Sequence, residues 1–412
     1  MKKTLISLAT ASLIASSAMA ADKGIDLDVT GQAVVYYQTA ATGSNQDLFS
    51  QNQSKANVGV QLNVGSDLGN GFVFGSQLTY LGTAGLEKNL VSNTMQTSAV
   101  NANGLIINGG HGVDALNTTS NQIMLTKVFV AKKMANTTVK IGRQELPKSL
   151  SPLAFTEGWN VFKNTFDAIV AINTDLPDTT LVGAYVGRST GMDLSTVGNL
   201  NASTILGSLP VTKTAYMLTA ANTSLPMTTL TASYYALSGV NAALHADAIW
   251  LDAKIADKSL PMGLNVGIQA GSISADTVDT TTAFGLKASA KPMAGLTVTG
   301  AFSSVDDGAL KIVNTGGVKT PLYTQMVANQ GKINHDNTTM MLKGAYSLGD
   351  AGTVIAQTSM TSSDSHGDNN ELDLVYVTNL GGAKVLAAYV YTKDDAAADA
   401  TNIVRVWARY AF

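Results

Sequence analysis

The chain has 412 residues, with 26 Lys and Arg, 29 Asp and Glu, and a formal net charge of −3 at pH 7. The slightly acidic balance argues against nucleic acid as a partner, and the absence of cysteine excludes a disulfide framework and thiolate chemistry. Hydrophobic residues make up 45% of the chain, yet beyond its N-terminal segment no stretch approaches the length of a transmembrane helix. Such a chain can occupy lipid only as a closed barrel, whose strands satisfy one another's backbone groups.

Residues 1–20 are typical of a secretory signal peptide. The segment begins with the basic pair Lys2 and Lys3, continues with an apolar stretch too short to cross a bilayer, and ends in a small-residue cleavage site at Ala20. We therefore predict export through the inner membrane, cleavage of this segment, and a single mature domain over residues 21–412.

Apolar and polar residues alternate along most of the remaining chain. In the first such segment Leu27, Val29 and Val35 share one face, while Thr30 and Gln32 lie on the other. A period of two indicates β-strands whose two faces contact different surroundings. The same pattern returns in later segments of about ten residues, the length that a tilted strand needs to cross a membrane.

Short turns rich in Gly, Pro, Asn and Asp alternate with long polar connections. The long connections cover residues 38–54, 82–120, 146–163, 189–211, 305–337, 361–369 and 392–400. This alternation is typical of short periplasmic turns and long extracellular loops, and the intervening segments number about 18. We predict an all-β fold: a transmembrane, antiparallel, up-and-down β-barrel of about 18 strands.

The last strand, over residues 402–412, shows which face meets lipid. An Arg on the lipid face costs roughly 2–4 kcal/mol at the membrane midplane, so Arg405 and Arg409 should point into the lumen. Tyr410 and Phe412 then point outward. Ending on an aromatic residue resembles the C-terminal signature of bacterial outer-membrane barrels, although a half-buried strand of a soluble sheet has the same alternation.

The connection over residues 145–163 is a candidate constriction. It carries the apolar residues Leu150, Leu153 and Phe155, which favour packing inside the barrel, although an ordinary extracellular loop is the alternative. Charges of opposite sign across a narrow aqueous pore create a transverse field. Arg143 is the strongest single candidate, because it lies where a strand enters this connection. The predicted pore-lining set is Lys127, Lys140, Arg143, Glu145, Lys148, Glu157, Asp167, Lys287, Lys343, Arg405 and Arg409.

Nothing in the sequence points to catalysis, a cofactor or a metal site. The four histidines, His111, His245, His335 and His366, lie in or beside predicted loops and lack the spacing of metal ligands. The Gly-x-Ser-x-Gly pattern of hydrolases is also absent. We therefore expect a protein that is not an enzyme.

Three stretches carry a family resemblance. They are Lys-Ile-Gly-Arg-Gln-Glu-Leu-Pro at residues 140–147, residues 155–160, and the hairpin leading through residues 176–185. The chain resembles the Opr-type outer-membrane porins of epsilonproteobacteria, relatives of the major outer-membrane porins of the Campylobacter group. The resemblance implies an eighteen-stranded barrel, often a homotrimer, that passes small hydrophilic solutes. It also implies contact with outer-membrane lipid and lipopolysaccharide, and assembly by the barrel-assembly machinery through Tyr410 and Phe412.

A different function stays open alongside this one. The connection over residues 82–120 is rich in Asn, Gly and Thr, like an exposed binding surface. The alternative is a structural or adhesive outer-membrane barrel whose loops bind surface ligands.

Overall fold

The structure is a computed structural model. It describes residues 27–44, 46–96, 99–100, 106–107, 122–191, 194, 198–199, 214–241, 244–276, 278–316 and 319–412. The predicted signal peptide and most of the connection 82–120 beyond residue 96 lie outside the described residues. Within the described part of the chain, no helix has both the length and the apolar character needed to cross a membrane.

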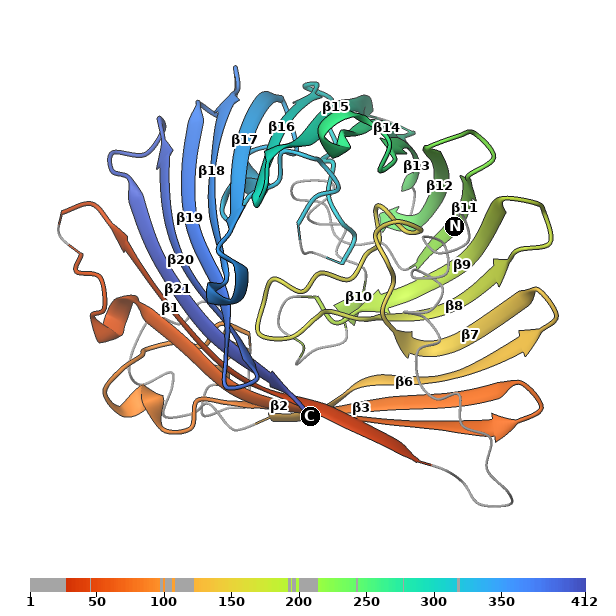
Figure 1. Cartoon of the computed structure of the whole chain (residues 1–412), viewed down its shortest axis with the longest axis horizontal. Coiled ribbons are helices and arrows are strands. Elements are labelled where there is room, and N and C mark those ends of the chain that lie inside the picture. The colour runs from red at the N-terminus through yellow and green to blue at the C-terminus, as the bar shows by residue number, and fades with distance from the viewer. Residues whose placement is uncertain are drawn as a thin grey trace.

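Eighteen long strands form one closed antiparallel barrel (Figure 1). Each strand pairs with the next along the chain, and β1 pairs with β21 from Gln32–Ala411 to Thr42–Thr401, which removes both edges of the sheet. The predicted all-β, up-and-down, antiparallel barrel is therefore confirmed. The strands are β1 (Asp28–Thr42), β2 (Ser54–Gly69), β3 (Phe72–Gly82), β6 (Gln122–Met134), β7 (Thr137–Gln144), β8 (Phe166–Asn173), β9 (Thr179–Ser189), β11 (Thr214–Asn222), β12 (Thr228–Asn241), β13 (Leu244–Ala256), β14 (Asn265–Ala275), β15 (Val278–Met293), β16 (Leu296–Val305), β17 (Asn337–Ser347), β18 (Thr353–Ser362), β19 (Asn369–Leu380), β20 (Ala383–Asp394) and β21 (Thr401–Ala411).

The remaining elements are short. They comprise the two-residue strands β4 (Ala99–Val100), β5 (Ile106–Ile107) and β10 (Gly198–Asn199), and the 3₁₀ turns η1 (Gln51–Gln53), η2 (Leu86–Lys88), η3 (Pro261–Gly263), η4 (Asn329–Gly331) and η5 (Gly349–Ala351). β10 pairs with the end of β9, and β4 pairs with β5 in a separate small sheet. None of these elements contributes a full strand to the barrel wall.

The two faces of each strand differ as the alternation predicts. On β19, Leu372 and Leu374 are 40% and 47% exposed on the outer face, while Glu371 and Asp373 are 1% and 0% exposed on the inner face. Side chains of successive strand residues point to opposite sides, so this parity gives β19 an apolar outer face and a polar inner face.

The predicted strict alternation of short and long connections is wrong at two places. β12 ends at Asn241 and β13 begins at Leu244, while β14 ends at Ala275 and β15 begins at Val278. Both connections lie at the end of the barrel that carries the long loops. They are short because these strands stay paired almost to the tip of each hairpin, with a register shift in each pairing near that end.

Two long connections fold into the barrel, and we call them inner loop A (residues 145–165) and inner loop B (residues 306–336, described except for 317–318). Figure 1 shows both inside the ring of strands, A in yellow and B in cyan. Apolar side chains of both loops join a buried cluster on the inner faces of β8, β9 and β11–β16, which includes Leu153 of loop A, Ile312 of loop B and Trp250 of β13. Loop A therefore folds inward, as its apolar residues predict.

The two inner loops are also hydrogen-bonded to each other. The backbone N–H of Phe155 donates to Asn314 Oδ1 at 2.9 Å, and Asn314 Nδ2 donates to the Phe155 carbonyl at 2.7 Å. The Thr315 N–H donates to the Leu153 carbonyl at 2.8 Å. These bonds satisfy backbone groups that the apolar surroundings would otherwise leave unpaired. Loops A and B thus form one packed unit inside the barrel.

Candidate pore lining and constriction

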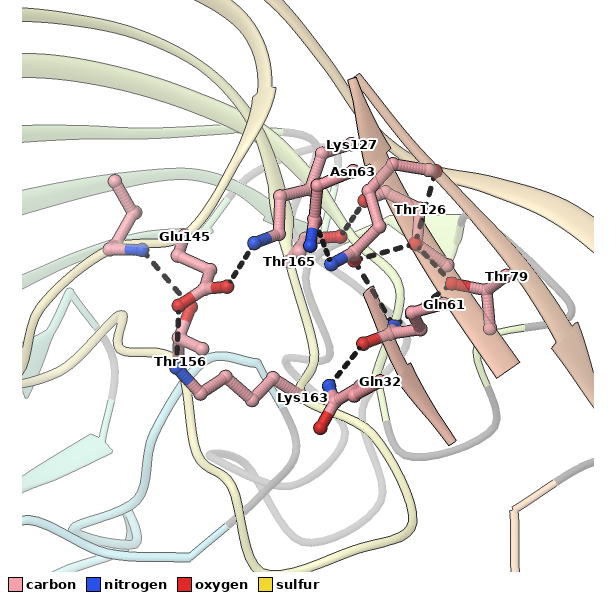
Figure 2. A network of polar contacts seen from close by, with 12 residues as sticks. Gln32, Gln61, Asn63, Thr79, Thr126, Lys127, Glu145, Thr156, Lys163 and Thr165 are labelled. Atoms are coloured by element: carbon pink, nitrogen blue, oxygen red, sulfur yellow. Dashed lines mark hydrogen bonds and ion pairs between the residues drawn. The ribbon is translucent and has the colours of Figure 1, made fainter. Parts of the chain in front are cut away.

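A charged triad joins inner loop A to the barrel wall (Figure 2). Lys127 comes from the inner face of β6, Glu145 directly follows β7, and Lys163 precedes β8. Lys127 Nζ pairs with Glu145 Oε1, and Lys163 Nζ lies 2.9 Å from Glu145 Oε2. Burial opposes ionisation of Glu145, but the charges and hydrogen bonds of the two lysines lower its pKa to about 2. The triad therefore carries two positive charges against one negative.

An uncharged polar network covers the adjoining wall of β1, β2, β3 and β6 (Figure 2). Gln32 Nε2 donates to Gln61 Oε1 at 2.6 Å, and Gln61 Nε2 donates to Thr79 Oγ1 at 2.9 Å. The hydroxyls of Thr79 and Thr126 are 2.6 Å apart, and the Thr165 hydroxyl donates to the Thr126 carbonyl at 2.8 Å. These bonds fix the side chains against the wall, so this part of the lumen is polar and rigid.

Arg405 on β21 makes a second contact between the barrel wall and inner loop A. Its Nε and Nη2 donate to Gln38 Oε1 at 2.9 and 2.7 Å, and its guanidinium carbon lies 5.0 Å from the centre of a ring of Trp159. Lys319 Nζ of inner loop B lies 4.6 Å from a Trp159 ring. The indole therefore contacts two cations, each attracted by its π-electrons.

Two acidic side chains lie on β19, two strands away from the β21 strand that carries Arg405. Glu371 and Asp373 are neighbouring inward positions of β19, and in the described part of the chain no ion pair joins either of them to Arg405 or Lys319. Glu371 Oε2, Asp373 Oδ1 and Arg405 Nη1 are buried without a hydrogen-bond partner. The other oxygens of the two acidic side chains do have partners: Glu371 Oε1 accepts a hydrogen bond from the Ala328 N–H of inner loop B at 2.7 Å, and Asp373 Oδ2 accepts one from Gln357 Nε2 at 2.6 Å. The two acidic side chains therefore attach inner loop B and β18 to the inner face of β19.

Most of the remaining predicted cations also lie on inner-face positions. Lys140 lies 3.6 Å from the Phe129 ring centre, and Lys287 lies 4.2 Å from that of Tyr323 in loop B. Lys343 is paired with Gln357 across β17 and β18, on the face opposite the exposed Leu342.

Three further predicted pore-lining residues either contact inner loop A or are part of it. Arg409 Nη2 donates to the carbonyl of Asn160 at 2.6 Å and so attaches β21 to the loop. Lys148 lies 5.0 Å from the Phe155 ring centre within the loop. Glu157 accepts a hydrogen bond from the Gly158 N–H at 2.8 Å, close to the Trp159 contact.

Arg143 and Asp167 do not lie with the rest. Arg143 follows the exposed Ile141 by two positions and pairs across the sheet with Asp167, which precedes the exposed Ile169 by two. Both therefore belong to the outer face, contrary to their prediction as pore-lining residues. Side chains alternate between the two faces of a strand, and Arg143 lies an odd number of residues, three, after the inward Lys140. They form a bidentate ion pair, Nε–Oδ1 at 2.7 Å and Nη2–Oδ2 at 3.2 Å, which compensates the two charges outside the lumen.

Sequence reasoning missed four residues that the site contains: Trp159, Lys319, Glu371 and Asp373. The two carboxylates were detectable, because they alternate with Leu372 and Leu374 in an otherwise apolar segment. Trp159 and Lys319 lie in inner loops without a periodic pattern, so no sequence signal places them. In the described residues, no group of three or more His, Asp or Glu side chains is arranged to hold a metal ion.

Comparisons with known proteins identify the barrel type. No family model and no curated protein sequence matches the chain. Solved structures do match: Pseudomonas aeruginosa OccK8 (OprE) has a TM-score of 0.72 at 14% identity, over 94% of this chain and 98% of that one. Acinetobacter baumannii OccAB3 has a TM-score of 0.70 at 12% identity, over 94% and 99%. Pseudomonas aeruginosa OpdK, solved with vanillate, also has a TM-score of 0.70 at 12% identity, over 93% and 98%. At these identities the likeness shows a shared fold.

Proposed function

We propose that this protein is an outer-membrane porin, a water-filled channel for passive diffusion of small hydrophilic solutes and ions. The observation that carries the proposal is a closed eighteen-strand barrel with an apolar exterior and a charged interior narrowed by inner loops A and B. A barrel of this size encloses more space than its own side chains fill. The inner loops then set the width and charge of the path.

The charges inside the barrel suggest how solutes are sorted. Lys127, Lys163 and Arg405 present positive charge near loop A, and Glu145 offsets only part of it. This excess of positive charge attracts an anion and orients a dipolar solute that passes it. The solved complex of OpdK with vanillate, an aromatic carboxylate, is consistent with such a path serving small organic anions here.

Export and assembly complete the proposal. Residues 1–20 are removed as a signal peptide, residues 21–412 form the mature barrel, and the barrel-assembly machinery inserts it beside lipopolysaccharide. Phe412 supports an assembly role, because its backbone exchanges hydrogen bonds with Gly31 at 2.7 and 2.9 Å while its ring is exposed on the outer face. The homotrimer and the affinity to epsilonproteobacterial porins rest on the sequence resemblance.

A planar-bilayer recording tests the channel. Purified, heat-modifiable barrel added to one side of the membrane should produce stepwise, largely voltage-tolerant conductance increments. Protein that inserts in folded form yet never conducts would overturn the proposal.

One observation favours a second candidate, a structural or adhesive barrel. Inner loops A and B pack tightly against β8, β9 and β11–β16, so a large part of the interior is filled with apolar side chains. If the remaining space is closed, the barrel would insert without conducting, and trimming the connection over residues 82–120 would abolish surface binding. The same recording therefore separates the two functions.

A further inference from the structure

Two histidines that are far apart in sequence meet at the loop end of the barrel. His335 lies near the end of inner loop B, two residues before β17, and His366 lies in the connection between β18 and β19. Their ring centroids are 5.4 Å apart with planes inclined at 45°, and His335 Nδ1 lies 3.2 Å from His366 Nε2. Neither residue takes part in the candidate constriction.

The separation of the two nitrogens suits ligands of one metal ion. Imidazole nitrogens bind zinc at about 2.0–2.1 Å, which places two ligands of a tetrahedral site roughly 3.4 Å apart. Adjacent ligands of a square-planar ion lie roughly 2.9 Å apart at the same bond length. The observed 3.2 Å falls between these values.

The surroundings of His335 present the correct nitrogen. His335 Nε2 contacts the carbonyl oxygen of Gly308, and a carbonyl can only accept, so Nε2 carries the hydrogen and Nδ1 keeps its lone pair. A backbone carbonyl that holds the second nitrogen of a ligating histidine is the usual outer support of such a ligand. In the metal-free pair His366 Nε2 then donates to His335 Nδ1, and it presents a lone pair to a metal ion after its hydrogen moves to Nδ1, the other neutral tautomer.

A carboxylate side chain, that of Asp336, lies beside the pair. Asp336 Oδ2 accepts hydrogen bonds from the Ser365 N–H at 3.0 Å and the Ser363 hydroxyl at 3.4 Å. These bonds hold the Asp336 side chain against the connection that carries His366.

We propose that His335 and His366 bind a divalent transition-metal ion, such as Zn²⁺, Ni²⁺ or Cu²⁺, with water completing its coordination. Imidazole selects these ions over Mg²⁺ and Ca²⁺, which prefer oxygen ligands. The ion would connect inner loop B to the β18–β19 connection, and so attach the loop to the wall at its outer end. This binding does not depend on whether the barrel conducts.

Isothermal titration calorimetry of the folded, detergent-solubilised barrel with ZnCl₂ tests the site. We expect saturable binding of one ion, weakened at least about tenfold in His335→Ala and in His366→Ala. His245→Ala, a histidine exposed at the start of β13, is the matched control and should bind like the wild type. MgCl₂ should give no saturable heat.

Two results would overturn the proposal. One is unchanged zinc affinity in both variants, and the other is no saturable binding to the wild type, which would leave only a hydrogen-bonded histidine pair. Heat-modifiable gel mobility of each variant checks that the barrel is folded. His366 lies on an exposed connection, so His366→Ala is informative even if His335→Ala folds poorly.

Discussion

Replacing Glu145 with Gln should make the channel more selective for anions. Glu145 is the shared partner of Lys127 and Lys163, with oxygens directed to each lysine. The amide is nearly the same size as the carboxylate and carries no charge, so the variant changes the triad from one net positive charge to two. The inner loop keeps its apolar packing, because that depends on other residues such as Leu150 and Leu153.

The size of the effect follows from Coulomb's law. One additional positive charge roughly 6 Å from a passing monovalent ion contributes about 0.7 kcal/mol in water. This raises the barrier for a cation and lowers the barrier for an anion by about 0.7 kcal/mol each. Each permeability therefore changes by about threefold, and the ratio of the two permeabilities changes by about tenfold. The Debye length falls from about 10 Å at 0.1 M salt to about 3 Å at 1 M, so the change should shrink at high salt.

Reversal potentials in a KCl gradient measure this ratio. The matched control is Asp167→Asn, which makes the same carboxylate-to-amide change and also breaks an ion pair, with Arg143. Asp167 lies on the outer face, so its variant should leave the reversal potential close to that of the wild type. Equal shifts in the two variants, or no shift for Glu145→Gln at 0.1 M salt, would refute the placement of the triad beside the diffusion path.

Three further changes test other parts of the structure. The lysines lower the pKa of Glu145 to about 2, so its carboxylate stays ionised at any higher pH. The difference in reversal potential between wild type and Glu145→Gln should therefore persist from about pH 7 to about pH 4 and disappear only as the pH approaches about 2. A difference that disappears near about pH 4.5 would contradict the strong pairing with the lysines. Leu153→Ala removes a buried side chain of inner loop A, a loss that typically costs 2–5 kcal/mol, so single-channel traces should become noisier, and an unaltered trace would mean that this packing does not hold the loop. Deleting Phe412 removes the hydrogen bonds to Gly31 and an exposed aromatic ring, so cell fractions should show periplasmic degradation and little heat-modifiable barrel; normal outer-membrane levels would argue against the assembly role.

Strand parity explains how far the sequence could predict the site. Alternation alone places Lys140 and Arg405 inward and Tyr410 outward, because the side of the sheet follows from counting residues along the strand. The same count from Lys140 places Arg143 outward. Arg143 therefore lies outside the lumen although it stands next to the loop, because nearness to a loop does not decide which face of the sheet a side chain occupies.

The inner loops could not be predicted in the same way. Phe155 and Asn314 are bonded to each other across 159 positions of sequence, and nothing near either residue indicates the partner. Trp159 and Lys319 meet only because loops A and B enter the barrel together. Apolar side chains in loop A did predict that it packs inward, since burial of apolar surface needs no periodic pattern.

The bonding between inner loops A and B gives the channel a mechanical property. Displacing loop A alone would break the Phe155–Asn314 and Leu153–Thr315 hydrogen bonds in apolar surroundings, where unpaired backbone groups are costly. A movement of the loops that widens the passage must therefore displace both loops together. The current should accordingly fluctuate between a few discrete sublevels. The hydrogen bonds between the loops break together, so the passage has no continuous range of intermediate openings.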